Sequence, residues 1–487
     1  MNIKLKRKAN KSKPTILLLS DDIRDFSGVA TQSKEIIFNT VSAFNWVQLA
    51  QRPKHQEHGK RLDVSKSVQD ETGVSDASVV LYPHDGYGNE ASLMHIVDKE
   101  KPDAIIHFTD PRFWGWLYDI EYKIRQRIPI IYYNIWDNLP DPKWNKPFYL
   151  SCDLLMSISK QTYGINHRIV ASSKDHVVSD ISDKNVRAEK DKRNVYLSYV
   201  PHGINQNTFY PILKNTEDYK IMKKMYFELF GTTQYDFILF WSNRNIKRKR
   251  PSDVILAYKE FVKKVHKQQD KKKVMLLLHT DALDSYGTNL YEVVKQLAPD
   301  VNIKFTPRKY SQRELNCLYN IVDCTLNISS AEGFGLTTAE SLMCGTPTIV
   351  NVTGGLQDQC GFTHKGKYLT EKDYIKLKTL SGTANTNIEV EHGKWSIPVF
   401  STLHTNVGSL PTPYIWEDYV NISDVANAIY VMYGLHPNTR NSMGMSGRTY
   451  MIENGFSATD LGKSIIEGVK HTIKTFQPKE RVFLIEV

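Results

Sequence analysis

The sequence predicts an α/β protein made of two doubly wound parallel sheets with helices on both faces. Short apolar runs such as residues 15–20 and 236–241 are typical of strands buried on both faces of a parallel sheet. Helical patterns alternate with these runs through both halves of the chain, which meet near residue 205. Ligands bind at the carboxyl ends of the strands in such sheets, so we expect the functional side chains there.

The individual strands and helices follow from the apolar pattern. Continuous apolar runs predict strands, and apolar positions three or four residues apart predict helices. The first half predicts strands near 15–20, 46–50, 79–82, 104–108, 129–133, 154–158 and 196–200, and helices near 90–99 and 111–127. The second half predicts strands near 236–241, 274–279, 301–305, 325–328 and 346–350, and helices near 311–322 and 337–343.

Four parts are expected along the chain. Residues 1–13 form a basic tail, 14–204 a first domain, 205–455 a second domain, and 456–487 a closing amphipathic helix with its tail. Residues 172–194 are charged and poor in apolar side chains, which predicts an exposed insertion within the first domain.

The composition is that of a globular protein with a basic surface. The chain of 487 residues is 41% hydrophobic, and no run reaches the roughly 18 apolar residues that a membrane-spanning helix needs. Its five cysteines lack C-x-x-C spacing, so we expect reduced core thiols in a cytoplasmic protein without a metal site. A net charge of +10 suits a polyanionic partner: nucleic acid, an anionic membrane surface or a phosphorylated substrate.

Residues 327–350 contain the most informative pattern. An apolar strand leads into a loop with Gly333 and Gly335, and a short helix and a second strand follow. A helix start presents free backbone N–H groups and positive dipole potential, which favour a phosphate. Glu332 and Glu340 flank the loop with seven residues between them, and carboxylates there suit the hydroxyls of a sugar. Thr337 and Glu340 also have the spacing of a helix capping box.

This stretch, Glu-Gly-Phe-Gly-Leu-Thr-Thr-Ala-Glu at 332–340, resembles the E-x7-E signature of retaining glycosyltransferases of the family 4 (group 1) type. The resemblance implies the GT-B fold, two Rossmann-like domains that face each other across a cleft, with the last helix crossing back to the first domain. It implies that Glu332 contacts the donor sugar and that Glu340 binds the ribose. The donor-binding residues implied in this stretch are Glu332, Gly333, Phe334, Gly335, Leu336, Thr337 and Glu340.

Other segments resemble the same family. Arg244 and Lys249 follow the strand 236–241 at the spacing of the family's two diphosphate-binding cations, although a solvated basic turn is the alternative. The Gly354–Gly355 turn is similar to a family turn that lines the donor pocket. Residues 357–420 are longer than the family's usual connection and are therefore expected to be a second insertion.

The first domain departs from the family pattern. Many members carry a histidine after the strand that corresponds to 129–133, whereas this chain has no histidine there. Asp137 is the nearest polar substitute and could accept a hydrogen bond from the acceptor hydroxyl or simply cap a turn. Asp110 and His107 are its rivals, His202 is expected to be a turn residue, and Gly28 is expected to help shape the cleft and the donor site.

We therefore expect a retaining, metal-independent hexosyl- or pentosyltransferase that uses a UDP- or GDP-sugar and needs no cofactor. The candidate catalytic residues are Asp137, Asp110, Arg244, Lys249 and Glu332. The acceptor stays open: the basic clusters permit a hydroxymethylated DNA base, and equally a lipid-linked or protein acceptor at an anionic surface. A non-enzymatic nucleic-acid-binding protein, an epimerase and a phosphorylase of similar fold are the alternatives.

Overall fold

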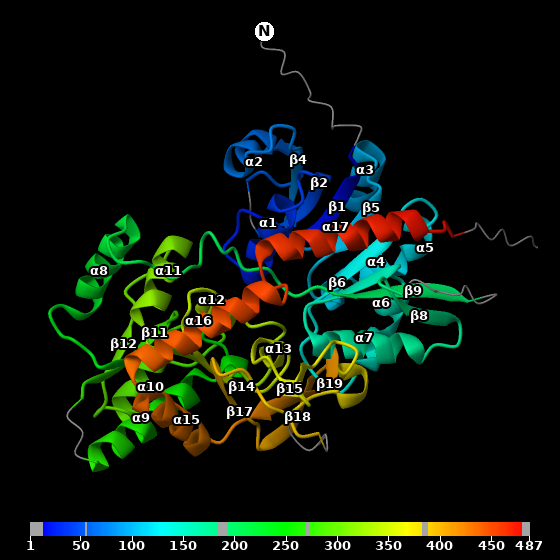
Figure 1. Cartoon of the computed structure of the whole chain (residues 1–487). Helices are drawn as coiled ribbons and strands as arrows, with labels where there is room; N and C mark the ends of the chain where they lie inside the picture. Colours follow the sequence, from blue (N-terminus) through cyan, green and yellow to red (C-terminus); the bar gives the residue numbers. More distant parts are fainter. Residues whose placement is uncertain (1–12, 54–55, 184–191, 269–271, 382–387, 480–487) are drawn as a thin grey trace, which may run out of the picture.

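The computed structural model describes residues 13–53, 56–183, 192–268, 272–381 and 388–479. These residues form two domains, each with a parallel sheet between layers of helices (Figure 1). The predicted fold class is confirmed. No helix in the described ranges is long and apolar enough to cross a lipid bilayer.

The first domain contains a nine-stranded sheet in the order β3-β4-β2-β1-β5-β6-β7-β9-β8. Every neighbouring pair is parallel except β3 with β4. The strands are β1 Thr15–Asp21, β2 Asn45–Gln51, β3 Leu62–Asp63, β4 Val79–His84, β5 Ala104–His107, β6 Ile130–Asn134, β7 Leu154–Ser157, β8 His176–Asp180 and β9 Arg193–Tyr199. The helices are α1 Gly28–Phe38, α2 Ser65–Thr72, α3 Glu90–Glu100, α4 Gly115–Asp119, α5 Glu121–Ile124, α6 Lys146–Leu150 and α7 Lys160–Ala171, with 3-10 turns η1 Pro111–Trp114 and η2 Lys143–Asn145.

The second domain contains a six-stranded parallel sheet in the order β12-β11-β10-β13-β14-β17. The strands are β10 Phe237–Ser242, β11 Val274–His279, β12 Ile303–Phe305, β13 Cys324–Asn327, β14 Thr348–Asn351 and β17 Ser396–Val399. The helices are α8 Glu217–Phe230, α9 Pro251–Lys267, α10 Leu290–Leu297, α11 Gln312–Ile321, α12 Leu336–Met343, α13 Leu356–Gln359, α14 Tyr374–Leu377, α15 Ile422–Gly434 and α16 Pro437–Glu453, with the 3-10 turn η3 Lys247–Lys249. In chain order this is the 3-2-1-4-5-6 arrangement, whose direction reverses between β10 and β13 and leaves a crevice there.

Both faces of each sheet are buried, which explains the continuous apolar runs. In β1, Ile16 and Leu18 pack into one buried cluster, and Leu17 and Leu19 pack into the cluster on the opposite face. The cluster around Ile16 and Leu18 continues without a break to Phe240 in the second sheet. The two domains therefore share one apolar layer.

Helix α17, Ala458–Thr475, follows the second domain but lies against the first (Figure 1). A Cβ atom on Gly462 would lie 2.8 Å from the Cβ of Asn39, at the end of α1. Ala458 N–H also donates to the carbonyl of Ile204, in the segment that joins the domains. The last helix therefore ties the two domains together.

Two expected segments of the first domain differ from the structure. The single helix predicted over 111–127 is broken into η1, α4 and α5, because Trp114 and Ile120 leave the helical conformation and bury their side chains in the layer below the sheet. Within the expected insertion 172–194, residues 176–180 form β8, which pairs with β9, while 184–191 lie outside the described residues. The predicted domain boundaries themselves stay predictions.

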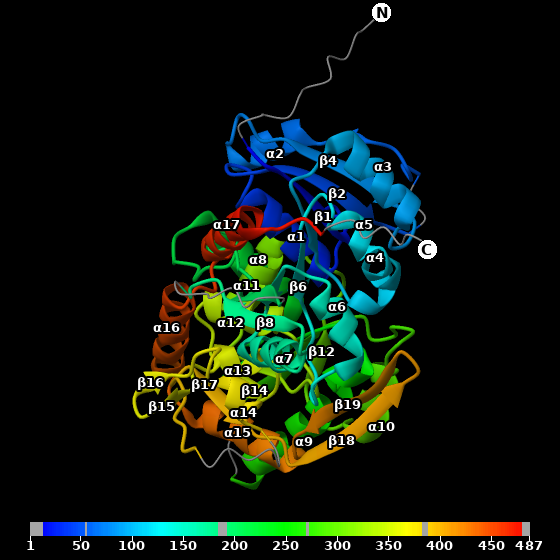
Figure 2. The same cartoon turned by 90° about the vertical axis from the view of Figure 1, so that its right-hand side faces the viewer.

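The expected insertion 357–420 is more structured than its sequence indicates. It supplies β17, the sixth strand of the second sheet, which pairs with β14. It also contains a long antiparallel hairpin of β18 Leu403–Ser409 and β19 Thr412–Tyr419, at the outer edge of the second domain (Figure 2), and a small hairpin of β15 Thr363–His364 and β16 Lys367–Tyr368. These segments form strands because they pair with other strands in the folded protein. Few of their residues show the apolar and polar alternation by which a strand is predicted from sequence.

Candidate functional site

The loop between β13 and α12 lies at the carboxyl edge of the second sheet, beside the crevice between β10 and β13. Gly335 is the N-cap of α12 and has a φ of 90°, a left-handed conformation that favours glycine. The N–H groups of Thr338 and Ala339 both donate to the carbonyl of Gly335, so those of Leu336 and Thr337 precede the first intrahelical hydrogen bond. This geometry suits an anion at the start of α12.

Four charged side chains meet at this loop. Lys249 forms a buried ion pair with Glu332, and Arg248 Nη1 lies 3.7 Å from the Glu332 carboxylate. The same Arg248 atom lies 3.9 Å from the carboxylate of Asp137, which comes from the first domain. The structure therefore brings Glu332, Lys249 and Asp137 together as candidates from both domains.

Burial and neighbouring charges shift the pKa values in this cluster. Burial lowers the pKa of Lys249 to about 8, against the opposing effect of Glu332. Burial would raise the pKa of Glu332, but Lys249 and Arg248 together lower it below its ordinary value. Burial raises the pKa of Asp137, and Arg248 opposes that shift. At neutral pH the Lys249 amine and the Glu332 carboxylate are therefore both charged.

The turn η3 and its C-cap carry four consecutive basic residues, 247–250, whose side chains have different surroundings. Arg248 is held by its backbone carbonyl, which accepts from Ser330 N–H at 2.7 Å, and by its guanidinium, which donates to the carbonyl of Ala331 at 2.8 Å. Lys247 is exposed, and Arg250 bonds to Asp253 and leaves the turn with a φ of 55°. Only Arg248 and Lys249 of this run reach the cluster.

Arg244 is not brought into this cluster. Its guanidinium donates to Asp284 Oδ2 at 2.6 Å and stacks over the ring of Tyr286, and its side chain is 60% exposed. The sequence spacing that favoured Arg244 places it at the end of β10 but does not decide its direction. Arg248, which the sequence analysis did not single out, occupies the position beside Glu332.

Glycines allow the loops to pack closely. A Cβ atom on Gly354 would lie 1.8 Å from the carbonyl oxygen of Glu332, and one on Gly355 would lie 2.4 Å from that of Gly333. A Cβ atom on Gly333 would lie 3.1 Å from the carbonyl oxygen of Ile135 in the first domain. Gly28 lies against Leu336, since its Cβ would be 3.2 Å from Leu336 Cδ1. The candidate glycines therefore lie where the two domains approach.

Glu340 lies inside α12, one turn beyond Glu332's loop. Its Oε2 atom accepts a hydrogen bond from the Tyr319 hydroxyl at 2.7 Å. Burial raises the pKa of Glu340 to about 7, although the Tyr319 hydroxyl opposes this shift. Because Gly335 caps the helix without a side chain, the capping-box interpretation of Thr337 and Glu340 is wrong.

The remaining candidates have other partners. Asp110 caps η1 and forms a bidentate ion pair with Arg112. His107 is fully buried between the Tyr118 and Thr109 hydroxyls, and burial lowers its pKa to about 3. His202 is buried too and bonds to the Tyr133 hydroxyl at 2.8 Å, so it is part of the packing between the domains rather than a simple turn residue. Phe334 packs near the His202 ring, with 5.1 Å between the ring centroids.

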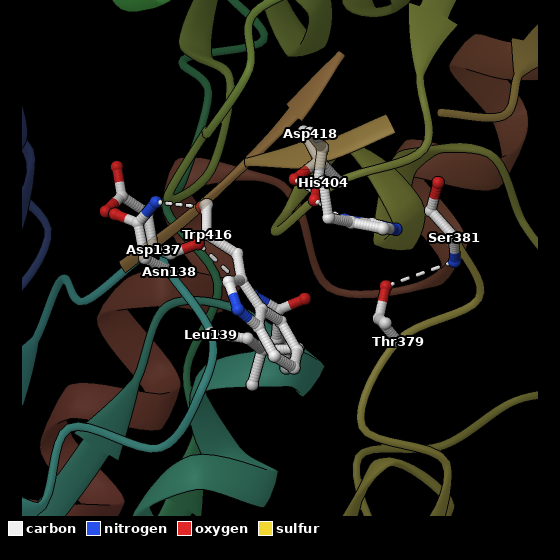
Figure 3. Close-up of a pocket in the computed structure, with 10 residues that line it drawn as sticks. Asp137, Asn138, Leu139, Thr379, Ser381, His404, Trp416 and Asp418 are labelled. Atoms are coloured by element: carbon white, nitrogen blue, oxygen red, sulfur yellow. Dashed lines mark hydrogen bonds and ion pairs between the residues drawn. The ribbon is translucent and has the colours of Figure 1, made fainter. Parts of the chain in front are cut away.

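A pocket of about 30 Å³ adjoins the cluster (Figure 3). Asp137, Asn138 and Leu139 line it from the first domain, while Thr353, His404, Trp416 and Asp418 line it from the second. The sequence analysis assigned no role to Trp416, His404 or Asp418, which lie within the expected insertion 357–420. No local sequence pattern would have found His404 and Asp418, because they are brought together only by the pairing of β18 with β19. In the described part of the chain, no group of three His, Cys, Asp or Glu side chains is placed to hold a metal ion.

Comparisons with known proteins bear on the family of the second domain and on the fold. Residues 227–378 match the family described as glycosyl transferases group 1. No curated protein matches the sequence.

Solved structures match nearly the whole chain. HepE from Anabaena, in complex with UDP and glucose, is 12% identical with a TM-score of 0.59, over 94% of this chain and 99% of that one. Sucrose-phosphate synthase from Thermosynechococcus elongatus is 12% identical with a TM-score of 0.61, over 95% and 100%. A glycosyltransferase from Rickettsia africae is 15% identical with a TM-score of 0.60, over 95% and 99%. The chain thus has the GT-B fold, and residues 227–378 within it match the family of group 1 glycosyl transferases.

Proposed function

We propose that the protein is a retaining glycosyltransferase that transfers a sugar from a nucleotide diphosphate, UDP in the first instance, without a metal ion. The observation that carries the proposal is the cluster beside the N-terminus of α12, in which the buried pair of Glu332 and Lys249 lies against the partly exposed Arg248. A diphosphate leaving group needs fixed positive charge, and the reacting sugar needs hydrogen-bond acceptors. The complex of HepE with UDP and glucose supports the choice of UDP.

The proposed roles follow from position and charge. Lys249 and Arg248 stabilise the negative charge that develops on the diphosphate, together with the backbone N–H groups of Leu336 and Thr337. Glu332 orients the sugar, and Glu340 binds the ribose hydroxyls. Because Lys249 already pairs with Glu332, the donor would meet a preorganised cation rather than a mobile one.

On the acceptor side, Asp137 is the candidate from the first domain, because it contacts Arg248 and lines the pocket. Asp110 is a weaker candidate, since both of its carboxylate oxygens accept hydrogen bonds from Arg112. The identity of the acceptor stays open.

The direct test is a thermal-shift panel of UDP-, GDP- and ADP-sugars. We expect one donor class to raise the melting temperature and nucleoside diphosphate to be released faster when an acceptor is present. Arg248→Ala should weaken donor binding by about 10-fold, as expected for a lost charge-assisted hydrogen bond. The exposed Arg244→Ala is the matched comparison and should have a smaller effect. No stabilisation by any nucleotide sugar would contradict the proposal, and a larger effect at Arg244 would reassign the second cation.

Gly354→Ala should weaken donor binding by about 10-fold, because the new methyl group would displace the Glu332 carbonyl and with it the loop. Gly366→Ala is the control. Gly366 has a φ of 73°, also in the left-handed region, but nothing lies within 4 Å of its Cβ position. Both variants carry the backbone strain of a left-handed alanine, about 1–2 kcal/mol, whereas only Gly354→Ala moves the loop. Equal donor affinities in titration calorimetry would contradict this role of the Gly354 contact.

A further inference from the structure

Hairpin β18–β19 belongs to the second domain and bonds to the first. Trp416 N–H donates to the carbonyl of Leu139 at 2.6 Å, and the Asn138 side chain donates to the carbonyl of Trp416 at 2.9 Å. Asp418 N–H donates to the carbonyl of Ser330, which directly precedes the Glu332 loop. The hairpin is therefore connected to both halves of the candidate site.

Two residues of this hairpin form a fixed dyad. His404 Nδ1 and Asp418 Oδ1 are 2.5 Å apart, and the other carboxylate oxygen of Asp418 accepts from the Thr353 hydroxyl at 2.6 Å. The Asn351 side chain donates to the Asp418 carbonyl at 3.0 Å. Because Asp418 is held on both oxygens and on its backbone, the imidazole has one well-defined orientation.

The other imidazole nitrogen has no such partner. His404 Nε2 is buried, and no described protein atom forms a hydrogen bond with it. A buried polar atom without a partner costs about 1–3 kcal/mol. Among the side chains that line the pocket, His404 alone carries such an atom, so Nε2 is available to a ligand there. The ring lies in the pocket between Asp418 and the segment of Thr379 and Ser381 (Figure 3).

The lining of the pocket has the chemistry of a sugar site. It combines the indole of Trp416 with carboxylate, amide and hydroxyl groups, contributed by Asp137, Asn138, Gln161, Thr379 and Ser381. An aromatic face with convergent polar groups suits a hydroxylated, uncharged ligand. The volume of about 30 Å³ accommodates one or two hydroxyl groups rather than a whole ring, since a site for one water needs about 10–15 Å³.

We propose that this pocket is an acceptor subsite, in which His404 Nε2 forms a hydrogen bond with a hydroxyl group of a neutral sugar. Asp418 is the positioning residue, and Asp137, which lines the pocket and lies 3.9 Å from Arg248, connects the subsite to the donor cluster. The inference rests on the proposed glycosyltransferase function and specifies its acceptor as a glycoside. A nucleic-acid acceptor would instead call for cations, and none of the side chains that line the pocket is basic apart from His404.

The test uses the full-length protein with the nucleoside diphosphate that it binds among UDP, GDP and ADP. Methyl glycosides of glucose, galactose, mannose and N-acetylglucosamine are the probes, observed by saturation-transfer NMR. We expect at least one glycoside to bind, and its addition to move the ¹⁵N resonance of His404 Nε2, identified by its loss in His404→Ala. His404→Ala and Asp418→Asn should weaken glycoside binding by about 10-fold, the loss of one hydrogen bond to a polar ligand.

Diphosphate affinity and melting temperature are measured in parallel for each variant. His404→Gln keeps a hydrogen-bonding group and therefore distinguishes the loss of the hydrogen bond from a folding defect. It should bind the glycoside with intermediate affinity. His392→Ala, at an exposed histidine of the same segment, should behave as the unmodified protein. Glycoside binding that His404→Ala leaves unchanged, or no glycoside binding in a protein that binds diphosphate, would overturn the subsite alone. A protein that binds no nucleoside diphosphate would instead contradict the proposed function.

Discussion

Replacing Lys249 with methionine should lower turnover by about 100- to 1000-fold, the usual effect of removing one fixed group that stabilises charge in the transition state. Lys249 is buried beside Glu332 at the start of the donor loop. Its charge is held in place before the leaving group forms, so little reorganisation is needed during the reaction. Steady-state kinetics should show the loss mainly in kcat, with a smaller change in the donor KM.

The same substitution should also destabilise the fold, because it leaves the buried Glu332 carboxylate with Arg248, at 3.7 Å, as its remaining cationic neighbour among the described residues. Removing one partner of a buried ion pair costs about 3–5 kcal/mol. The double variant Lys249→Met with Glu332→Gln should recover much of this stability in denaturant unfolding but none of the turnover. Lys247→Met, on the exposed side of the same turn, is the control. A double variant with recovered turnover would show that Lys249 acts only through the fold.

The pH profile gives a separate check on Lys249. Because burial lowers its pKa to about 8, the amine loses its proton as the pH rises through that value. We therefore expect kcat/KM, which reports the free enzyme, to decline above about pH 8. The decline should be absent in Lys249→Met. A profile that stays flat to pH 10 in the unmodified protein would contradict this assignment.

Replacing Glu340 with glutamine should move stability and donor affinity in opposite directions. As the ribose ligand, a carboxylate makes charge-assisted hydrogen bonds, so its loss should weaken donor binding by about 10- to 100-fold. In the free protein Glu340 is partly buried, and its charge is unfavourable. The amide keeps an oxygen for the Tyr319 hydroxyl and carries no charge, so the variant should be more stable.

The direction of the pH dependence follows from the raised pKa of Glu340. Between its ordinary value of 4.5 and the folded value of about 7, the folded state holds a proton that the unfolded state has lost. The protein therefore loses stability as the pH rises through this window, by at most about 3 kcal/mol. Glu340→Gln should be the more stable at pH 8, and the advantage should vanish near pH 4.5.

Unfolding by urea at both pH values, with donor binding by calorimetry, measures the two effects together. The exposed Glu453→Gln, on α16, is the matched control and should change neither. A Glu340→Gln variant that binds donor normally would remove Glu340 from the site, whatever its stability.

Most of the scaffold could be predicted from the sequence because parallel strands carry their own signal. The run Ile16–Leu19 is apolar at every position, since alternate side chains enter opposite buried layers. The same holds for the runs around Phe237 and Val274. The helix over 111–127 was predicted less well, because the burial of Trp114 and Ile120 outweighs helical continuity.

The donor loop could be predicted from the sequence for a related reason. Gly333, Gly335 and the two glutamates lie within nine residues, and a loop with a helix start is local structure. Lys249 was also among the sequence candidates, but the second cation could not be predicted, because the contacts of Arg244 and Arg248 decide which of the two reaches Glu332. The hydrogen bond to Asp284 holds the Arg244 side chain outside the cluster. The hydrogen bonds of Arg248 with Ser330 and Ala331 hold its side chain beside Glu332.

The sequence by itself determined the two doubly wound sheets, the glycine loop and its two carboxylates, since these depend on apolar patterning and on neighbours a few residues apart. Only the tertiary structure decided which cations face Glu332 and that Asp137 reaches them from the other domain. It also decided that His404 and Asp418 line a pocket with residues of both domains. These contacts join residues as far apart as 137 and 418, and they depend on how the domains close on each other. No spacing along the chain carries that information, because it is set by packing between surfaces that are far apart in the sequence.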